Sequence, residues 1–391
     1  MRDRFLPFAP PCLGEEEIAE VVATLRSGWL TTGPRARRFE EEFAAFVGAP
    51  AAVALNSCSA GLHAGLVAAG VGPGDAVVTT PMTFIATANA IEHAGARPVV
   101  ADVDPETLDL DPACAADAIT RATRSGLRVR ALLPVHYAGH PCNMDALADL
   151  AAAHGLALIE DAAHALPAGI AGRLVGAPVR AGVTSLASFS FYANKNLTTG
   201  EGGMLTGPRH AIDRARAFSQ QGLAAESGVP IWRRDAIAPG FKYAMSDVAA
   251  ALGLRQLEKL PAFHARRREL AAHYHDTLRH LPDVVTPVER PGFAHAWHLY
   301  VVQVAIERLS IDRDRIVQEL AARNIGASVH FRPVHLVTYY RERYGLLPHD
   351  LPVTMSAWPH VLSLPLHPSM TNADVDDVVE ALADVIRRHR R

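Results

Sequence analysis

Ala51-Ala52-Val53-Ala54-Leu55 is an unbroken apolar run that passes through Asn56-Ser57-Cys58 into a helical pattern over Ser59–Ala69. Continuous apolarity predicts a strand covered on both faces, as the strands of parallel sheets are. The same strand-then-helix unit recurs up to about residue 205. It predicts further strands at Ala76–Thr80, Pro98–Val103, Val129–Val135, Leu156–Glu160 and Thr184–Phe191, and helices at Phe84–Ala94 and Met144–His154. This alternation indicates an α/β fold with a mostly parallel central sheet flanked by helices.

The pattern changes in the second half of the chain. A long helix is predicted from Ser246 to about His280, with Pro261 as the point at which it would break, and a shorter N-terminal helix begins near Glu15. We therefore predict a large α/β domain over residues 1–255, including an N-terminal arm, and a small C-terminal α+β domain over residues 256–391. The small domain is expected to contain strands at Leu299–Ala305 and Ala327–Phe331, a helix at Asp312–Arg323, and a last helix capped near Thr371 that ends at about Arg388.

Composition excludes several classes of protein. The chain has 391 residues, 49% of them hydrophobic, and a net charge of −3, so no strong field favours nucleic acid or a membrane surface. The four cysteines are widely separated and show no CxxC spacing, which argues against a disulfide framework. No signal peptide and no membrane-spanning stretch is recognisable. The sequence predicts a cytoplasmic protein.

Lys195 is the residue that points most directly to chemistry. It lies in Ser188-Phe189-Ser190-Phe191-Tyr192-Ala193-Asn194-Lys195-Asn196-Leu197-Thr198-Thr199-Gly200-Glu201-Gly202-Gly203, between a predicted strand and a glycine turn. An amine held at the end of a strand, beside hydroxyls and glycines, is suited to form a Schiff base with a carbonyl cofactor. The alternative is an ordinary surface lysine in a polar loop.

The end of the strand Leu156–Glu160 carries two further candidates. Asp161 could pair with the protonated nitrogen of a pyridine ring, or it could be the N-cap of a helix. His164 could hydrogen-bond the phenolic oxygen of the same cofactor, or it could be a core histidine satisfied by backbone groups.

Two other strand ends suit a phosphate and a planar ring. Small residues at a helix start provide free backbone N–H groups for an anion, so Ser59 and Ala60 are phosphate-loop candidates with Ser190 as a third anchor; simple helix capping is the alternative. Phe84 could stack on a cofactor ring, or it could belong to the core. Cys58 has no basic partner in sequence, which favours a packed small residue over a nucleophile.

Two motifs carry no function by this reasoning. Gly70-Val71-Gly72-Pro73-Gly74 precedes a strand, whereas a nucleotide-binding glycine loop follows one. His330 and His335 lack a third ligand, and Pro333 between them indicates a rigid turn, so we predict no metal site.

With these residues placed, the sequence resembles the DegT/DnrJ/EryC1/StrS family of sugar aminotransferases, which have the aspartate aminotransferase (type I) fold. The resemblance covers nearly the whole chain. It rests on Gly28–Pro34, Pro134–Gly139, Ile159–His164, Lys195–Gly203 and Gly240–Tyr243 in this order, and it ends at Leu362–Leu366. It implies pyridoxal 5′-phosphate (PLP) as cofactor, with Lys195 as its covalent anchor and Asp161 as partner of the pyridine nitrogen. It also implies Phe84 on the ring face, His164 near the ring, Ser59, Ala60 and Ser190 at the phosphate, and Thr31, His330 and Arg332 as substrate residues.

The resemblance also implies an activity. Glutamate would supply an amino group to the keto group of a nucleotide-linked sugar, and Ala296–Leu299, Val329–His335 and Tyr339–Arg343 favour a UDP-4-keto-pentose of the L-arabinose type. A homodimer with shared active sites is expected. The alternatives are another 4-keto-hexose or 3-keto nucleotide sugar, a cyclitol aminotransferase of antibiotic or surface-polysaccharide biosynthesis, and a PLP-binding regulator without turnover. A related sugar dehydratase would have histidine in place of Lys195.

Two residues depart from the family pattern. Relatives often have an asparagine near the position of Lys242 that reaches the phosphate in the neighbouring subunit, and here Lys242-Tyr243-Ala244 contains none. Phe84 stands where tryptophan is expected in the L-arabinose type. The first departure puts the cross-subunit contact in question, and the second weakens the assignment of a pentose.

Overall fold

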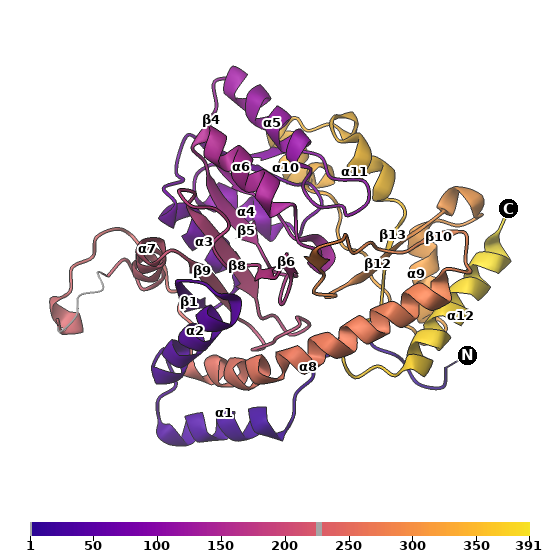
Figure 1. Ribbon diagram of the computed structural model, residues 1–391, viewed down its shortest axis with the longest axis horizontal. Coiled ribbons are helices and arrows are strands. Elements are labelled where there is room, and N and C mark those ends of the chain that lie inside the picture. Colours follow the sequence, from indigo (N-terminus) through magenta and orange to yellow (C-terminus); the bar gives the residue numbers. More distant parts are fainter. Residues whose placement is uncertain (1, 224–228) are drawn as a thin grey trace.

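The computed structural model describes residues 2–223 and 229–391 and centres on a sheet of seven strands (Figure 1). The strands follow the order β1 (Ala51–Leu55), β9 (Gly203–Gly207), β8 (Ser185–Ser190), β5 (Ala157–Asp161), β4 (Arg128–Leu133), β2 (Asp75–Thr79) and β3 (Arg97–Val100). Only β9 is antiparallel to its neighbours β1 and β8, so the other six strands share one direction. The predicted mostly parallel sheet is confirmed.

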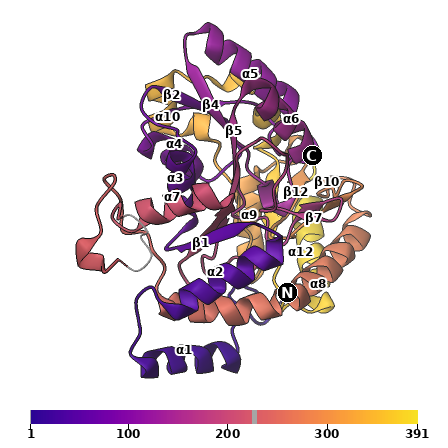
Figure 2. The same cartoon turned by 60° about the vertical axis from the view of Figure 1, so that its left-hand side comes forward.

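Helices cover both faces of this sheet, which explains why its strands are mostly apolar (Figure 2). In β1, Val53 and Leu55 enter a core with α3 (Cys58–Ala68), α4 (Ala86–His93) and α7 (Arg209–Ser219). Ala52 and Ala54 enter the opposite core with α2 (Pro34–Val47). α5 (Pro112–Arg124) and α6 (Met144–His154) continue the cover on that second face.

One long helix, α8 (Asp247–Leu278), joins the two halves of the molecule (Figure 1). α1 (Glu15–Ser27) packs on α8, as do α2 and α12 (Asn372–His389). The break predicted at Pro261 is wrong, because α8 continues through it. Leu260 and Leu270 are fully buried on either side of this proline, in two different cores, and this packing outweighs the cost of about 3 kcal/mol for a proline inside a helix. The predicted domain boundary between residues 255 and 256 falls inside α8, and the division into two domains stays a prediction.

The C-terminal part contains an antiparallel sheet of β10 (Val284–Val285), β12 (Tyr300–Val304) and β13 (Val361–Leu364), together with α9 (Arg313–Ala321) and α12. The strand predicted at Ala327–Phe331 is wrong. Only Ser328 forms a bridge, to Ser363 of β13, because the chain then turns away so that His330 and Phe331 line a cavity. The last helix is capped by Thr371, as predicted.

Shorter elements complete the chain. A third sheet joins β11 (Phe293–Ala294), β6 (Gly169–Ile170) and β7 (Arg173–Leu174), and two short helices are α10 (Thr338–Tyr344) and α11 (Pro352–Ala357). Single 3₁₀ turns lie at Tyr137–Gly139, Ile231–Arg233, Ile306–Arg308, Val334–Leu336 and Pro348–Asp350. In residues 2–223 and 229–391, no helix combines the length and apolar character needed to cross a membrane.

Buried polar contacts tie the two halves together. The carboxylate of Asp102 accepts hydrogen bonds from the backbone N–H groups of Val353 and Thr354, at 2.8 and 2.9 Å, and from the Thr354 hydroxyl at 2.6 Å. These contacts hold the first turn of α11 against the central sheet. Tyr340 of α10 donates a hydrogen bond of 2.6 Å to Asn89 of α4.

Candidate active site

A cavity of about 500 Å³ lies where the carboxyl ends of the large-sheet strands meet the C-terminal part of the chain. Parallel strands end at the same edge of a sheet, which explains why residues distant in sequence converge there. The cavity is lined by six of the predicted cofactor residues: Ser59, Phe84, Asp161, His164, Ser190 and Lys195. The C-terminal part contributes His298, His330 and Phe331.

Lys195 follows β8 in a turn that is closed by a hydrogen bond of 2.9 Å from its own N–H to the carbonyl of Tyr192. Burial lowers the pKa of its ammonium group from 10.5 to about 8, although the nearby Cys58 and Asp161 oppose this shift. The amine is therefore partly neutral near physiological pH. A neutral amine is the form that attacks a carbonyl or accepts a proton.

Asp161 is the last residue of β5, and its carboxylate is buried. One oxygen accepts a 2.7 Å hydrogen bond from the Thr87 hydroxyl, and the other accepts a 3.1 Å hydrogen bond from the N–H of Ala163. No helix follows it, so the N-cap alternative is wrong. Burial raises the pKa of Asp161, and no ion pair to it is found within the described ranges. A cation placed beside this carboxylate would stabilise its charged form.

His164 lines the cavity, and its Nδ1 is buried without a hydrogen bond in the part of the chain that the structure describes. Its ring contacts those of His298, at 4.6 Å between centroids, and Phe331, at 5.7 Å. Burial lowers the pKa of His164 well below its usual range, so the ring is neutral. The alternative of a core histidine satisfied by backbone groups is therefore not supported.

Phe84 is 58% exposed although it lines the cavity, so it is not a core residue. Its ring centroid lies 5.6 Å from that of Phe331. An aromatic face left open at a cavity is available to a planar ligand.

The turn after β1 provides an anion site. α3 begins at Cys58, and its N-cap is Ser57, whose hydroxyl accepts a hydrogen bond of 3.1 Å from the N–H of Ala60. The N–H groups of Cys58 and Ser59 have no acceptor among the described residues. Gly203 passes close below this turn: a Cβ on it would lie 2.5 Å from the carbonyl carbon of Ser57. Only glycine permits this approach.

The remaining predicted residues are placed as follows. Ala60 is buried and does not line the cavity. Its N–H is bound to the hydroxyl of Ser57, which caps the helix. Thr31 is exposed, with its carbonyl bound to the N–H of Asp247 at 3.1 Å. Arg332 is exposed and donates a hydrogen bond of 2.9 Å to the carbonyl of Leu336. Neither Thr31 nor Arg332 lines the cavity, so their roles stay predictions.

Cys58 is packed, as expected. Its thiol lies 3.4 Å from the carbonyl of Ser188, and burial raises its pKa. His335 is fully buried with Nε2 3.2 Å from the sulfur of Met355, which fits a structural role.

Sequence reasoning missed several cavity residues. Ser57 and Thr87 were not predicted, because the cap formed by Ser57 and the hydrogen bond from Thr87 to Asp161 depend on the residue at which each helix begins. Asn194 lies directly before Lys195, and its Oδ1 is buried without a partner in the described ranges; this adjacency was a signal that could have identified it. His298 lies about a hundred residues further along the chain; the resemblance included it in Ala296–Leu299 but gave it no role of its own. The polar residues added to the cavity lining are Ser57, Thr83, Tyr192, Asn194, Glu201 and His298. Thr87 does not line the cavity and acts through its hydrogen bond to Asp161.

A half-buried lysine of lowered pKa, a buried carboxylate without an ion pair among the described residues, and a helix-start anion site on one α/β sheet define a PLP-dependent transaminase of the type I fold. Comparison with known proteins makes this specific. Residues 11–383 match the model of the DegT/DnrJ/EryC1/StrS aminotransferase family, and the chain belongs to this family. It is a PLP-dependent sugar aminotransferase, of a family whose members act on nucleotide sugars.

Individual relatives cover almost the whole chain. The spore coat polysaccharide biosynthesis protein SpsC of Bacillus subtilis is 44% identical, over 99% of this chain and 98% of that protein. The PLP form of Spr1654 from Streptococcus pneumoniae is 30% identical with a TM-score of 0.88, over 98% and 99% of the two chains. DesI, solved in the presence of its TDP-sugar product, is 31% identical with a TM-score of 0.85, over 98% and 93%.

The residues at the cavity fit PLP. The aldehyde requires an amine, the pyridine nitrogen requires an anion, the phosphate requires N–H donors and the phenolic oxygen requires a polar neighbour. Lys195, Asp161, the turn at Ser57–Ser59 and the unpartnered His164 meet these requirements in one space.

Proposed function

We propose that this aminotransferase transfers the amino group of glutamate to the keto group of a nucleotide-linked sugar, in two half-reactions that use the same cavity. The observation that carries the proposal is the joint presence of Lys195 and Asp161 at a cavity that also has a helix-start anion site. Bound PLP supplies a carbonyl that takes up the amino group and a ring that withdraws electrons from the reacting carbon.

Lys195 performs the proton transfers in this proposal. Burial keeps about a tenth of its amine neutral at pH 7, so Nζ can remove the proton from the α carbon of glutamate. In the second half-reaction the same nitrogen returns a proton to the sugar carbon that receives the amine. A pKa of about 8 suits both directions, because neither the neutral nor the charged form is rare near neutrality.

Asp161, Phe84 and the phosphate turn hold the cofactor. Asp161 keeps its negative charge when a cationic ring nitrogen lies beside it, and Thr87 fixes the orientation of its carboxylate. The open ring of Phe84 would cover one face of the bound cofactor. Ser59 and Ser190 are assigned to the phosphate, with Ser57 added as the residue that caps the turn. The predicted role of Ala60 at the phosphate is secondary, because its N–H is already bound to the Ser57 hydroxyl.

The acceptor is a keto sugar joined to a nucleotide. DesI with a TDP-sugar product and the polysaccharide protein SpsC support this class of substrate and a role in polysaccharide synthesis. Within the class, a UDP-4-keto-pentose of the L-arabinose type is the first choice. We assign Thr31, His330 and Arg332 to this substrate.

We further propose that two copies of the chain form the working enzyme and share their active sites. The cavity is bordered by exposed aromatic side chains, Phe84 at 58% and Tyr192 at 49%, and Trp29 and Phe241 are exposed at 54% and 45% elsewhere on the surface. Such apolar groups favour burial in an interface. Lys242 is exposed, and we assign it to the phosphate in the partner subunit in place of the usual asparagine.

The decisive experiment measures each half-reaction separately. Protein loaded with PLP is mixed with glutamate, and the change in absorbance of the bound cofactor is followed. The aminated form is then mixed with UDP-4-keto-pentose, 4-keto-hexose, 3-keto-hexose nucleotides and cyclitol ketones, and the recovery of absorbance is timed. Lys195→Ala serves as the inactive control, and borohydride reduction followed by peptide mass spectrometry locates the covalent anchor.

Rapid reaction of one keto-sugar nucleotide, with loss of both half-reactions in Lys195→Ala, is the expected result. Reaction of glutamate without reaction of any keto-sugar nucleotide would refute the acceptor class. A cofactor adduct on Lys242 or Lys259 instead of Lys195 would refute the site itself.

A further inference from the structure

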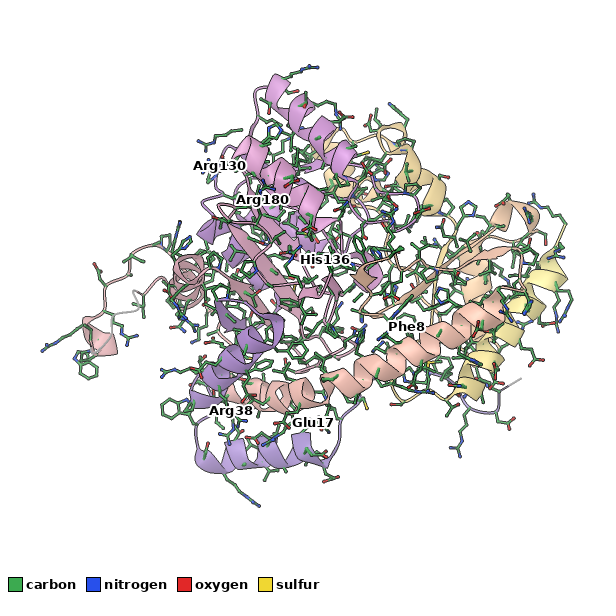
Figure 3. The ribbon with its side chains drawn as sticks, viewed as in Figure 1. Phe8, Glu17, Arg38, Arg130, His136 and Arg180 are labelled. Carbon is green, nitrogen blue, oxygen red and sulfur yellow. The ribbon has the colours of Figure 1, made fainter. Side chains whose placement is uncertain are left out.

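His330 is held from three sides at the edge of the cavity. Its Nδ1 lies 2.8 Å from the hydroxyl oxygen of Ser363. Its backbone carbonyl accepts a hydrogen bond from the hydroxyl of Tyr137. The ring of Phe8 stacks on its imidazole at 5.4 Å between centroids, with an angle of 23° between planes. Phe8 comes from the N-terminal segment, which crosses the C-terminal part of the chain (Figure 3).

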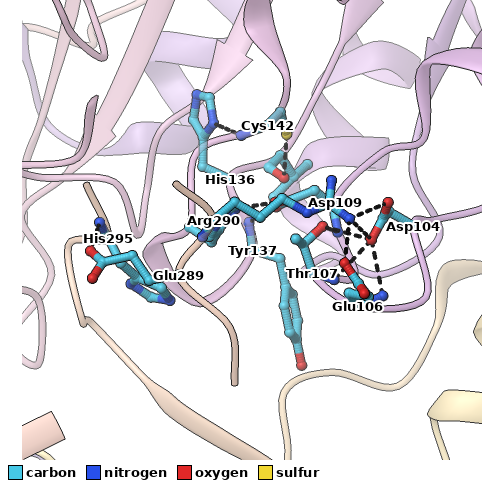
Figure 4. Close-up of polar contacts among 12 residues, drawn as sticks. Asp104, Glu106, Thr107, Asp109, His136, Tyr137, Cys142, Glu289, Arg290 and His295 are labelled. Atoms are coloured by element: carbon cyan, nitrogen blue, oxygen red, sulfur yellow. Dashed lines mark hydrogen bonds and ion pairs between the residues drawn. The ribbon is translucent and has the colours of Figure 1, made fainter. Parts of the chain in front are cut away.

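The supports of His330 are themselves fixed. The backbone N–H of Tyr137 donates a hydrogen bond of 2.9 Å to Asp109, which also binds Nδ1 of His140 at 2.8 Å. Figure 4 shows the Tyr137 side chain pointing away from this polar cluster. Ser363 lies in β13, is fully buried, and exchanges two backbone hydrogen bonds with Ser328 at 2.8 and 3.1 Å. The imidazole ring therefore has little freedom to turn.

The Ser363 hydroxyl decides where the ring proton lies. In residues 2–223 and 229–391 its only hydrogen-bond partner is Nδ1 of His330. If Nδ1 carried the proton, the Ser363 oxygen would accept a hydrogen bond from it. The buried hydroxyl hydrogen of Ser363 would then have no acceptor, and the protein would bear the full desolvation penalty of an unsatisfied donor. If Ser363 donates, both groups are satisfied. The second arrangement leaves Nδ1 as acceptor and the proton on Nε2.

The ring is also neutral. Burial, assisted by the charge of Lys195, lowers the pKa of His330 to about 4. A neutral imidazole has a proton on only one of its two nitrogens, so an unprotonated Nδ1 means that Nε2 is protonated. Nε2 has no hydrogen bond in the described ranges, and His330 lines the cavity.

We infer that Ser363 is a positioning residue that locks His330 as its Nε2–H tautomer, so that His330 acts as a hydrogen-bond donor to an oxygen of the bound substrate and never as a base. The inference deepens the proposed function and rests on it for the identity of the substrate. The oxygen belongs either to a carboxylate of the amino donor or to the keto sugar. Both are acceptors, and the two half-reactions separate them.

The first test reads the tautomer directly and needs no turnover. PLP-loaded protein labelled with ¹⁵N-histidine is studied by two-bond ¹H–¹⁵N correlation spectra at neutral pH, and the His330 signals are assigned by their loss in His330→Gln. The expected pattern is a protonated Nε2 and an unprotonated Nδ1. Ser363→Ala is expected to give a mixture of tautomers, and Ser363→Thr, which keeps the hydroxyl, is expected to restore the wild-type pattern.

The second test uses two matched substitutions. The amide nitrogen of glutamine reaches the place of Nε2, whereas the amide nitrogen of asparagine reaches only the place of Nδ1. His330→Gln keeps a donor at the place of Nε2 and is therefore expected to have the lower KM of the two variants. His330→Asn is expected to raise KM about tenfold in one half-reaction, with a smaller change in kcat, because one hydrogen bond to the substrate is lost. A rise for glutamate identifies a carboxylate oxygen, and a rise for the keto sugar identifies a sugar oxygen.

The outcomes distinguish this inference from the proposed function. Protonated Nδ1 in the wild type, an unchanged tautomer in Ser363→Ala, or unchanged KM values in both half-reactions of His330→Asn would each overturn it. Failure of the wild-type enzyme to react with any keto sugar would refute the proposed acceptor. In that case the spectra alone would still decide whether His330 is protonated at Nε2.

Discussion

The lowered pKa of Lys195 makes a quantitative prediction about its reactivity. A pKa shift from 10.5 to about 8 means that burial destabilises the protonated amine by about 3 kcal/mol relative to the neutral amine. At pH 7 about 9% of the Lys195 amine is then neutral, roughly 300 times the share of an unperturbed lysine. Its reaction with an electrophile should rise about 5-fold from pH 7 to 8 and less than 2-fold from pH 8 to 9. An ordinary lysine gains about tenfold in each interval.

The assay exploits the scarcity of lysine in this chain. Lys195, Lys242 and Lys259 are the only lysines. Cofactor-free protein is treated briefly with formaldehyde and a borane reductant between pH 6.5 and 10, and methylation of each lysine is measured by peptide mass spectrometry. The exposed Lys242 is the internal reference. A Lys195 rate that keeps rising in parallel with Lys242 up to pH 10 would show that burial does not shift the pKa, and the argument for Lys195 as a base near neutrality would fail.

Three further substitutions test the supports of the site and of the fold. Asp161→Asn keeps the shape of a buried group and removes its charge, so the glutamate half-reaction should slow at least 100-fold (about 3 kcal/mol) while absorbance shows the cofactor still attached; a loss below tenfold would contradict the role of Asp161. Gly203→Ala brings a methyl group to 2.5 Å from the Ser57 backbone and should weaken PLP binding more than tenfold, whereas Gly72→Ala, with no atom within 4 Å, should bind PLP normally in the same titration. Asp102→Ala removes three hydrogen bonds across the two halves and should lower the free energy of unfolding in urea by about 3 kcal/mol, against less than about 0.5 kcal/mol for the exposed Asp117→Ala; equal values would show that α11 does not depend on this contact.

The large sheet was predictable because its signals are local. Each strand is a short apolar run next to a helical pattern, and β1 and α6 have the predicted bounds. The errors arose where distant contacts decide. Pro261 would break an isolated helix, but packing on both sides holds α8 together. Ala327–Phe331 has the composition of a strand, yet the hydrogen bonds that would pair it are replaced by a single bridge to Ser363.

The part of the candidate site that lies on the large sheet was predictable for the same reason, because its residues follow locally recognisable strands. Asp161 and Lys195 follow strands, and strand ends in this kind of sheet share one edge, so their convergence follows from the fold class. On the C-terminal side of the cavity, His330 was expected from the resemblance alone, and the position of His298 followed from no strand end. His298 reaches the cavity because its backbone carbonyl is bound at 3.4 Å by the buried Arg267 of α8, a contact between residues that no sequence pattern relates.

The charge of the cavity bears on how a nucleotide sugar is held. In the described part of the chain, Lys195 is the one cationic side chain of the lining, since burial lowers the pKa of His164, His298 and His330 and keeps these rings neutral. The lining also includes the carboxylates of Asp161 and Glu201. A diphosphate brings negative charges that require cations or many N–H donors. Among the described residues, this lining provides a single anion site, and the proposed cofactor phosphate occupies it. The cations for the nucleotide must therefore come from outside this lining, either from Arg332 of the same chain or from the proposed second copy of the chain.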